Sequence, residues 1–118
     1  MSMETDLVAL LQAICPRAYP DVAPPGAVLP YIVWQPLGGE ALRFVDGTAP
    51  DKRNTYLQVA VWSATRAEAI ALIHQVEDAI TAAPAFASAL PEGEARATYE
   101  ATTQRYGSIQ RFDIWATR

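Results

Sequence analysis

The stretch NTYLQVAVWSATRAEAIALIHQVEDAITA, residues 54–82, predicts a strand that runs directly into a helix. From Asn54 to Trp62 the side chains alternate with the period of two that is typical of a sheet strand. β-Branched and aromatic residues are frequent in this segment and favour the same conformation. One side of the strand is mostly apolar and is expected to face the core; it consists of Thr55, Leu57, Val59 and Val61.

The helix that follows is marked at both of its ends. Ser63 and Thr65 offer hydroxyls to the unpaired N–H groups of a helix start, and Glu68 stands three residues after Thr65, as in a capping box. Pro84 ends the helix because proline has no backbone donor. About 17 helical residues give a rod of about 25 Å, long enough to cover one face of a small sheet. The apolar stripe of this helix recurs every three or four residues and consists of Ala69, Leu72, Ile73, Val76, Ala79 and Ile80.

Length and composition indicate a single domain over residues 1–118 with no membrane-spanning segment. A chain of this size buries roughly two thirds of its unfolded surface, which is enough for a core. Hydrophobic residues make up 51% of the chain and charged residues 19%, as in ordinary globular domains. No apolar run approaches the roughly 18 residues of a membrane span. Residues 1–6 are acidic and lead into a helical pattern, so we expect no signal peptide and an intracellular protein.

The cysteine count and the net charge exclude further classes of function. Cys15 is the only cysteine, so neither an internal disulfide nor a cysteine-based metal cluster can form. The formal net charge is −4. An acidic chain is poorly suited to tight binding of nucleic acid, because binding phosphates requires a basic surface. It can still lie next to DNA without gripping it.

The chain before the central strand is expected to hold a helix, a connector and a short strand. Ser2 or Thr5 can cap the helix, and Pro16 ends it. Five prolines lie within residues 16–30, which makes regular structure improbable there. Tyr31 to Gln35 is aromatic and β-branched and is predicted to form a strand. The apolar stripe of the first helix consists of Leu7, Leu10, Leu11 and Ile14.

A long connection, Leu37 to Arg53, separates the first two predicted strands. It is too long for a tight turn and rich in turn residues, yet Ala41 to Val45 alternates well enough to extend a strand. Asp46 and Gly47 form a strong two-residue turn signal, so the segment is expected to be a protruding β-arm or a long loop. Leu42 and Phe44 would share one face of the arm. Either they fold back onto the core, or they stay exposed until another subunit covers them.

After the central helix, Ala85 to Gly93 is expected to be a loop with a possible short helical turn. Arg96 to Ala101 and Gln104 to Trp115 are then predicted to pair as a terminal hairpin. The order of elements is α-β-β-α-β-β. We therefore expect an α+β domain with a small mixed or antiparallel sheet and two helices packed against it.

None of the chemically active side chains stands in a catalytic motif. His74 is the only histidine, and no serine, cysteine or carboxylate is placed by a motif to work with it, so we expect it to border the helix stripe. Cys15 is expected to be a small packing residue at a helix end. The acidic residues Glu92, Glu94 and Glu100 are expected to form a solvated edge, because paired catalytic carboxylates also need a pocket.

The other candidates favour structural roles as well. Gly38 and Gly39 lack the further glycine and lysine of a phosphate-binding loop and are expected to form a turn or bulge. A weakly basic patch would need Lys52, Arg53, Arg105 and Arg111 to meet, whereas ordinary surface pairing with interleaved acids is the simpler interpretation. Trp34, Trp62 and Trp115 fall in three different strands and are expected to pack in the core or at an interface.

Several motifs together resemble a family of phage proteins. They are PYIVWQ at 30–35, LQVAVW at 57–62 with SATRAEA directly after it, and FDIW at 112–115. The chain is similar to the tail completion, or tail terminator, proteins of long non-contractile-tailed phages, which are also common in prophages and similar in role to the lambda minor tail protein U. The similar motifs are structural rather than catalytic, and the similarity extends over nearly the whole chain.

The resemblance implies a non-enzymatic structural subunit that uses no cofactor and no metal ion. Copies of the chain would assemble into a ring, expected to be a hexamer, that caps the finished tube of tail tube protein and presents its other face to head connector proteins. The subunit would occur in the bacterial host cytoplasm during assembly and afterwards in the virion tail. DNA would pass the acidic surface without specific binding, and no membrane is involved.

In this interpretation Leu42 and Phe44 are the candidates for the subunit interface. One alternative is a head-tail joining adaptor of a neighbouring class. Another is a small ligand-binding α+β domain with a pocket between the sheet and the helices. The absence of a nucleophile and base pair by motif argues against a hydrolase.

Overall fold

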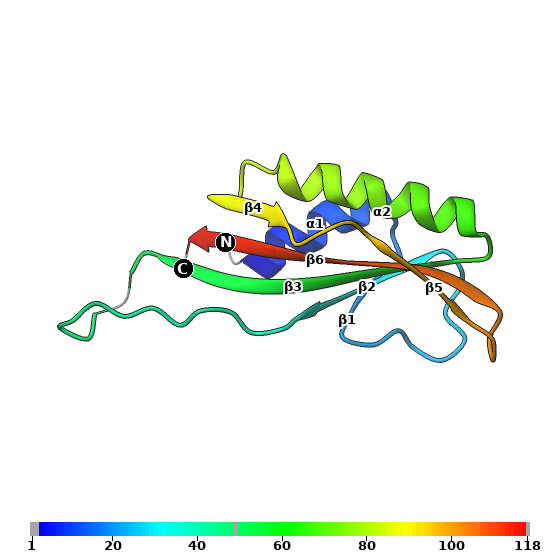
Figure 1. Cartoon of the computed structure of the whole chain (residues 1–118), viewed down its shortest axis with the longest axis horizontal. Helices are drawn as coiled ribbons and strands as arrows, with labels where there is room; N and C mark the ends of the chain where they lie inside the picture. Colours follow the sequence, from blue (N-terminus) through cyan, green and yellow to red (C-terminus); the bar gives the residue numbers. More distant parts are fainter. Residues whose placement is uncertain (1–2, 49, 118) are drawn as a thin grey trace.

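The computed structural model describes residues 3–48 and 50–117 and confirms the α+β class. Two helices lie on one face of a six-stranded mixed sheet (Figure 1). The elements in chain order are α1 (Met3–Ile14), β1 (Ala18–Pro20), β2 (Tyr31–Pro36), β3 (Lys52–Ser63), α2 (Arg66–Thr81), β4 (Ser88–Pro91), β5 (Arg96–Glu100) and β6 (Arg105–Thr117).

The long antiparallel pair of β3 and β6 forms the centre of the sheet. Its register runs from Lys52 opposite Thr117 to Ser63 opposite Tyr106, so the two strands pair over their whole length. β2 adds antiparallel to β3, and β1 adds parallel to β2, which makes the sheet mixed. On the other side, β4 and β5 pair with successive parts of β6 and together form one interrupted edge.

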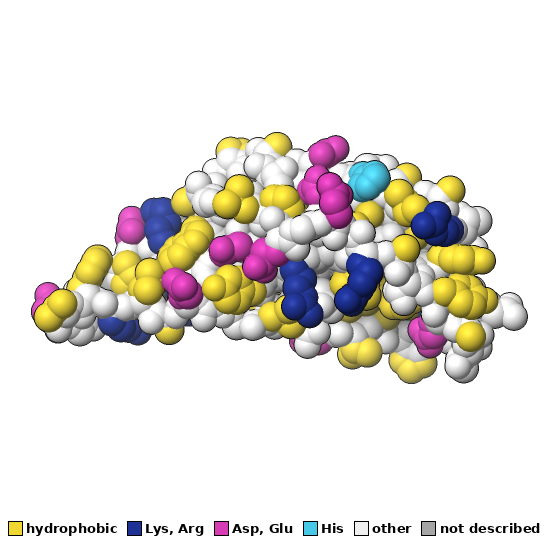
Figure 2. Space-filling view, viewed as in Figure 1, with side chains coloured by type: hydrophobic (Ala, Val, Ile, Leu, Met, Phe, Trp, Pro, Cys, Tyr) yellow, Lys and Arg dark blue, Asp and Glu magenta, His cyan; other side chains and the backbone are white. Residues whose placement is uncertain are grey.

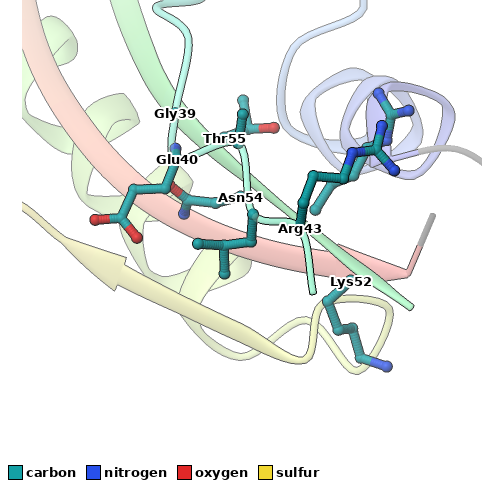
Figure 3. Close-up of a pocket in the computed structure, with 9 residues that line it drawn as sticks. Gly39, Glu40, Arg43, Lys52, Asn54 and Thr55 are labelled. Carbon is teal, nitrogen blue, oxygen red and sulfur yellow. The ribbon is translucent and has the colours of Figure 1, made fainter. Parts of the chain in front are cut away.

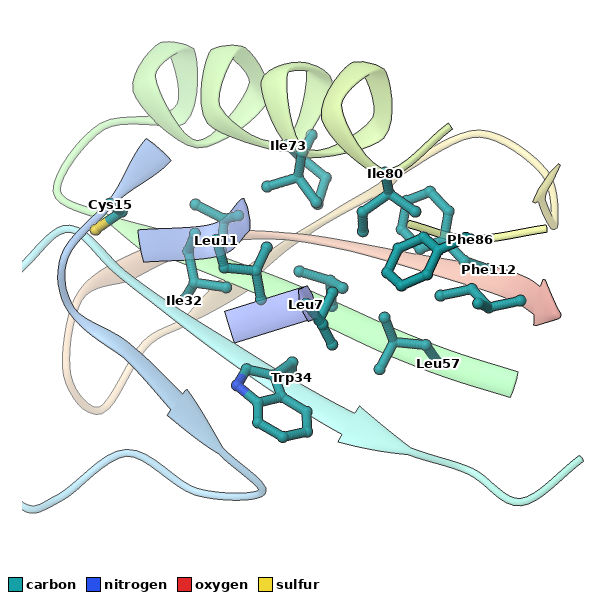
Figure 4. Close-up of a cluster of buried hydrophobic side chains, with 14 of the residues drawn as sticks. Leu7, Leu11, Cys15, Ile32, Trp34, Leu57, Ile73, Ile80, Phe86 and Phe112 are labelled. Atoms are coloured by element: carbon teal, nitrogen blue, oxygen red, sulfur yellow. The ribbon is translucent and has the colours of Figure 1, made fainter. Parts of the chain in front are cut away.

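The strand and the helix read from residues 54–82 form one core, as predicted. Leu57, Val59 and Val61 are fully buried on the side of β3 that faces the helices, and Leu72 of α2 packs against them while staying partly exposed. Figure 4 shows this cluster between the sheet and the two helices. The helices contribute a further set of buried apolar side chains, namely Leu7 and Leu11 from α1, and Ala69, Ile73, Val76 and Ile80 from α2.

The N-terminal cap of α2 differs in one detail from the predicted capping box. Thr65 is the N-cap, and its hydroxyl accepts a hydrogen bond from the Glu68 N–H (3.2 Å), as predicted. The Glu68 carboxylate, however, accepts a hydrogen bond from the Ser63 hydroxyl, whose oxygen in turn accepts one from the Thr65 N–H (3.3 Å). The buried hydroxyl of Ser63 therefore connects the Glu68 carboxylate to the Thr65 N–H, which the carboxylate would bond directly in a capping box. In α1, Thr5 lies inside the first turn, and the alternative cap Ser2 lies outside the described residues.

Two strands were not expected from the sequence. Residues 18–20, within the proline-rich connector, form β1, because the backbone of Ala18–Pro20 can lie along β2 and end with Pro20 at the edge of the sheet. Ser88–Pro91, expected to be a loop, forms β4 along β6. Both strands are held by pairing with a longer neighbour rather than by their own pattern.

Among the described residues, neither helix combines the length and the apolar character needed to cross a bilayer.

Candidate functional site: the arm and the uncovered sheet face

The connection between β2 and β3 projects from the end of the sheet as a narrow arm (Figure 1). The arm contributes to an elongated molecule with principal extents of 53 × 25 × 25 Å. Of the two forms expected for this segment, a β-arm or a long loop, the structure shows the loop, because residues 41–44 take no regular structure and pair with no described strand. A strand needs a neighbouring strand to complete its backbone hydrogen bonds, and a loop that projects from the domain has none. An alternating sequence pattern is therefore not sufficient to form a strand here.

The base of the arm is tied to the end of β3. The Leu37 N–H donates to the Tyr56 carbonyl (2.6 Å), and the Tyr56 N–H donates to the Gly38 carbonyl (2.8 Å). The Glu40 N–H donates to Asn54 Oδ1 (2.9 Å). Figure 3 shows Gly39 and Glu40 beside Asn54 and Thr55, with Arg43 and Lys52 farther out. These hydrogen bonds fix the direction in which the arm leaves the sheet, although the arm beyond its base is not part of the sheet.

Gly39 and Asn54 make this attachment possible. A Cβ on Gly39, whose φ is +153°, would lie 2.4 Å from the Asn54 carbonyl oxygen, so only glycine allows the approach. The Asn54 amide also donates to the carboxylate of Asp113 and to the Ile114 carbonyl (3.1 Å) on β6. Asn54 thus links the arm to the central strand pair.

The tip of the arm is a three-residue turn between Phe44 and Thr48. The Phe44 N–H donates to the Thr48 carbonyl (2.9 Å), and the Gly47 N–H donates to the Phe44 carbonyl (2.8 Å), with Gly47 at a φ of +87°. The predicted position of the turn is confirmed, but the turn has three residues instead of two. Asp46 accepts hydrogen bonds from the N–H (3.0 Å) and the hydroxyl (2.7 Å) of Thr48, which lower the pKa of its carboxyl group.

Apolar side chains near the tip are open to solvent. The exposed fractions are 44% for Leu42, 59% for Phe44 and 110% for Val45. Of the two alternatives left open by the sequence, folding back onto the core does not occur within the chain. Arg43 stands between Leu42 and Phe44, is exposed, and has no ion pair with a described residue. The arm therefore presents apolar groups around one cation.

The face of the sheet opposite the helices carries a second surface with exposed apolar groups among polar ones. A shallow hollow of about 460 Å³ lies on this face. The connector between β1 and β2 forms one wall of it through Asp21, Val22 and Ala23, and Glu100 stands on another side. The strand residues that line the hollow are Tyr31, Val33, Gln35, Gln58, Ala60, Trp62 and Ile109.

Aromatic and cationic contacts hold the hollow in shape. Arg105 donates a hydrogen bond to the Tyr31 hydroxyl, and its guanidinium lies 5.4 Å from the centre of the Tyr31 ring. The Tyr19 ring meets the Tyr31 ring edge-on at 6.2 Å. Trp62 packs over Gly107, where a Cβ would lie 2.8 Å from the indole. The hollow is thus formed before any partner arrives.

Carboxylates surround Tyr56 near the base of the arm. Burial raises the pKa of the Tyr56 phenol, and the negative charges of Glu40, Asp113 and Glu92 raise it further. This part of the uncovered face is therefore acidic.

The sequence candidates for chemistry are not brought together. His74 is exposed on α2, and the Cys15 thiol is buried against the backbone carbonyls of Arg17 and Pro30. Glu92 and Glu94 line an open depression together with arginines, whereas Glu100 borders the hollow instead. Within residues 3–48 and 50–117, no three His, Cys, Asp or Glu side chains are grouped to hold a metal ion.

The basic residues and the tryptophans also separate. Lys52 and Arg53 lie at the arm, while Arg105 lies at the opposite end of the β3–β6 pair, so these residues form no common patch. On the face shown in Figure 2, Lys and Arg side chains are scattered among acidic and hydrophobic side chains. Trp34 is buried in the core, whereas Trp62 and Trp115 are partly exposed on the uncovered face.

The hollow was not predicted from the sequence, although individual residues indicated it. Trp62 and Tyr31 have large rings on the strand faces that alternate away from the core, which is a place where a sheet covered on one side normally carries polar groups. Alternation therefore hints at a second apolar face. That Val22 and Glu100 border the same hollow depends on tertiary folding and has no local signature.

Comparison with known proteins supports a single family. The family model described as "Tail completion protein gp17" matches residues 4–117. A solved structure, a chain of the "Virion of native gene transfer agent (GTA) particle", is similar with a TM-score of 0.73 at 16% sequence identity and covers 99% of this chain and 96% of its own. At that identity the likeness concerns the fold. No curated protein sequence matches the chain.

Proposed function

This chain belongs to the tail completion protein gp17 family and is a structural component of a phage tail, and from that premise we propose that it forms a ring that terminates the tail tube. The ring is a hexamer of identical subunits. One of its faces contacts the tail tube protein, and the other contacts the head connector proteins. Assembly takes place in the cytoplasm of the bacterial host, and the finished ring stays in the virion tail.

The observation that carries this proposal is the arm. A subunit that worked alone would gain nothing by holding Leu42, Phe44 and Val45 in water at the end of a projecting loop. The base of the arm is nevertheless fixed by Gly39 and Asn54, so its direction is built into the fold. A fixed apolar projection is suited to bind a neighbouring subunit.

The charge of the chain supports a passive relation to DNA. The net charge is −4, and Lys and Arg are scattered on the face that Figure 2 shows, which is unfavourable for binding phosphates. A ring of such subunits would repel the genome slightly and let it slide through. The structural role of the family supports a subunit without enzymatic activity.

Electron microscopy tests the proposal most directly. The purified protein is imaged by negative stain, alone and mixed with tail tubes, and light scattering follows its mass over a wide range of concentration. We expect rings of uniform diameter, located at one end of the tubes. A protein that stays monomeric at every concentration and leaves the tubes uncapped would contradict the proposal. Rings that bind only isolated head connectors would instead identify a head-tail joining adaptor.

A further inference from the structure

We propose that the hollow on the uncovered sheet face receives the arm tip of the next subunit, so that Leu42 and Phe44 of one copy lie on Tyr31, Val33 and Trp62 of its neighbour. The inference rests on the proposed ring and names the surface that accepts the arm. It starts from an apolar projection and a partly apolar hollow, neither of which is covered by another part of the described chain.

The arm cannot fill the hollow of its own chain. β3 runs from the arm at Lys52 to the hollow at Ala60 and Trp62. Gln58 is the hollow residue of β3 nearest the arm, and the six residue steps from Lys52 to Gln58 alone span about 20 Å. The arm also continues the direction of the strands away from the sheet (Figure 1). The arm tip therefore lies far from the hollow of its own chain, and a second copy can bring the two surfaces together.

An arm that enters the hollow of an identical copy can do so in two ways. In a two-fold dimer, each of two copies places its arm in the hollow of the other. In a head-to-tail arrangement, each subunit gives its arm to one neighbour and receives the arm of another, which generates a ring when the rotation between neighbours closes. The proposed ring requires the head-to-tail arrangement, and the mass measured by light scattering distinguishes it from a dimer.

Charge complementarity favours the same pairing. Arg43 projects between the two apolar residues of the arm, and the border of the hollow carries the exposed carboxylates of Asp21 and Glu100. The structure gives none of these three side chains an ion pair within the described chain. Docking the arm in the hollow would place the cation against the anions while the apolar groups cover Val33 and Trp62. Opposite charges of this kind fix the register of an interface.

The hollow is also suited to a chain segment rather than to an enclosed small molecule. It is shallow and open, with Val22 standing 75% exposed on its wall. Its lining combines apolar side chains with polar and charged ones, and Arg105 holds Tyr31 in place. A preformed surface lowers the entropy cost of binding.

Cysteine pairing between copies tests the contact. In a Cys15→Ala background, one protein carries Phe44→Cys on the arm and a second carries Val33→Cys in the hollow. The two are mixed under ring-forming conditions with tail tubes and oxidised. We expect a disulfide-linked dimer of the two different proteins to dominate. Replacing the hollow cysteine by Gln75→Cys, which is exposed on α2 on the opposite side of the sheet, should give at most a tenth of that yield, by order of magnitude.

Charge exchange provides a second, independent readout. Arg43→Glu and Glu100→Lys should each weaken subunit association by about tenfold, and the double variant should recover to within about threefold of the parent, since the pair is then reversed. Arg43→Lys serves as the matched control and should associate like the parent. Circular dichroism confirms that all variants remain folded.

The outcomes separate this inference from the ring proposal. Rings that form and cap tubes without the cross-link between residues 44 and 33, or charge effects that simply add in the double variant, would overturn the arm-and-hollow contact and leave the ring intact. A hollow that binds a small ligand or another tail protein while rings assemble normally would overturn it as well. If no variant and no parent protein associates at all, both proposals fail.

Discussion

At the scale of single residues, Gly39 decides how closely the arm approaches the sheet. An alanine there would place its Cβ 2.4 Å from the Asn54 carbonyl oxygen. Gly38 has a φ of +90° and open space around it, so Gly38→Ala adds only the cost of the left-handed backbone, about 1–2 kcal/mol. We expect Gly39→Ala to lower the free energy of unfolding by at least about 1 kcal/mol more than Gly38→Ala, because backbone must move.

Urea denaturation of both variants measures this difference. Equal losses would mean that the approach of the arm to Asn54 tolerates a side chain.

Asp46 gives the tip of the arm a dependence on pH. Its pKa is lowered because the ionised carboxylate accepts two hydrogen bonds from Thr48. For a carboxyl group with a lowered pKa, the stabilisation is complete above the ordinary pKa of 3.8 and is lost as the pH falls through the lower value of the folded state. We therefore expect the Thr48 amide resonance to titrate below pH 3.8.

Nuclear magnetic resonance of the labelled protein follows this titration. In Asp46→Asn the pH-dependent shift of the Thr48 amide should disappear. A midpoint at or above the ordinary aspartate value in the parent would show that the turn does not depend on the charge.

Single residues also mark the limits of reading the arm from sequence. The turn at Asp46 and Gly47 was predictable, because the chemistry of a turn is local. The close approach of Gly39 to the Asn54 carbonyl was not predictable, because the two residues are distant along the chain. The exposure of Leu42 and Phe44 was likewise left open, since alternation fixes a shared face but not what covers it.

At the scale of elements, the pairing of β3 with α2 carries the core. Ile73 is fully buried among the side chains of the sheet. Ile73→Ala should lower the free energy of unfolding by about 2–5 kcal/mol, because it removes buried methyl groups and leaves a cavity. Gln75→Ala, on the exposed side of the same helix, is the matched control and should change it by less than about 0.5 kcal/mol.

Chemical denaturation followed by circular dichroism compares the two variants. An Ile73→Ala protein as stable as the parent would show that the helix does not depend on this packing.

The elements differ in how far their sequence determines them. β3 and α2 were predictable because each is long enough for its own periodicity and because Thr65 and Pro84 mark the limits of the helix. β1 and β4 were not, because three or four residues carry too little pattern and are held by their neighbours β2 and β6. The uncovered face was not predictable, because the sequence does not show which face of the sheet the two helices cover.

At the scale of the whole molecule, substitutions in the arm are expected to weaken the association of subunits without changing the stability of the fold. Leu42→Ser with Phe44→Ser removes two exposed apolar groups that contact no core. Interfaces usually concentrate their energy in a few aromatic or apolar anchors, so association should lose several kcal/mol. The melting temperature should stay within a few degrees of the parent, because the core is unchanged.

Light scattering and thermal melts measure the two effects on the same samples. Val28→Ser, an exposed apolar residue of the connector outside the arm, is the control and should leave association intact. If the double variant unfolds, the two side chains stabilise the monomer and the arm is not an interface.

The interrupted outer edge of the sheet has a consequence for the free subunit. A long, flat edge strand would invite other copies to add strand upon strand and grow into fibres. Here β4 and β5 are short and are separated by residues 92–95, where Gly93 takes a φ of +85°. The opposite edge, β1, has three residues and ends in a proline. We therefore expect free subunits to resist amyloid-like growth through the edges of the sheet.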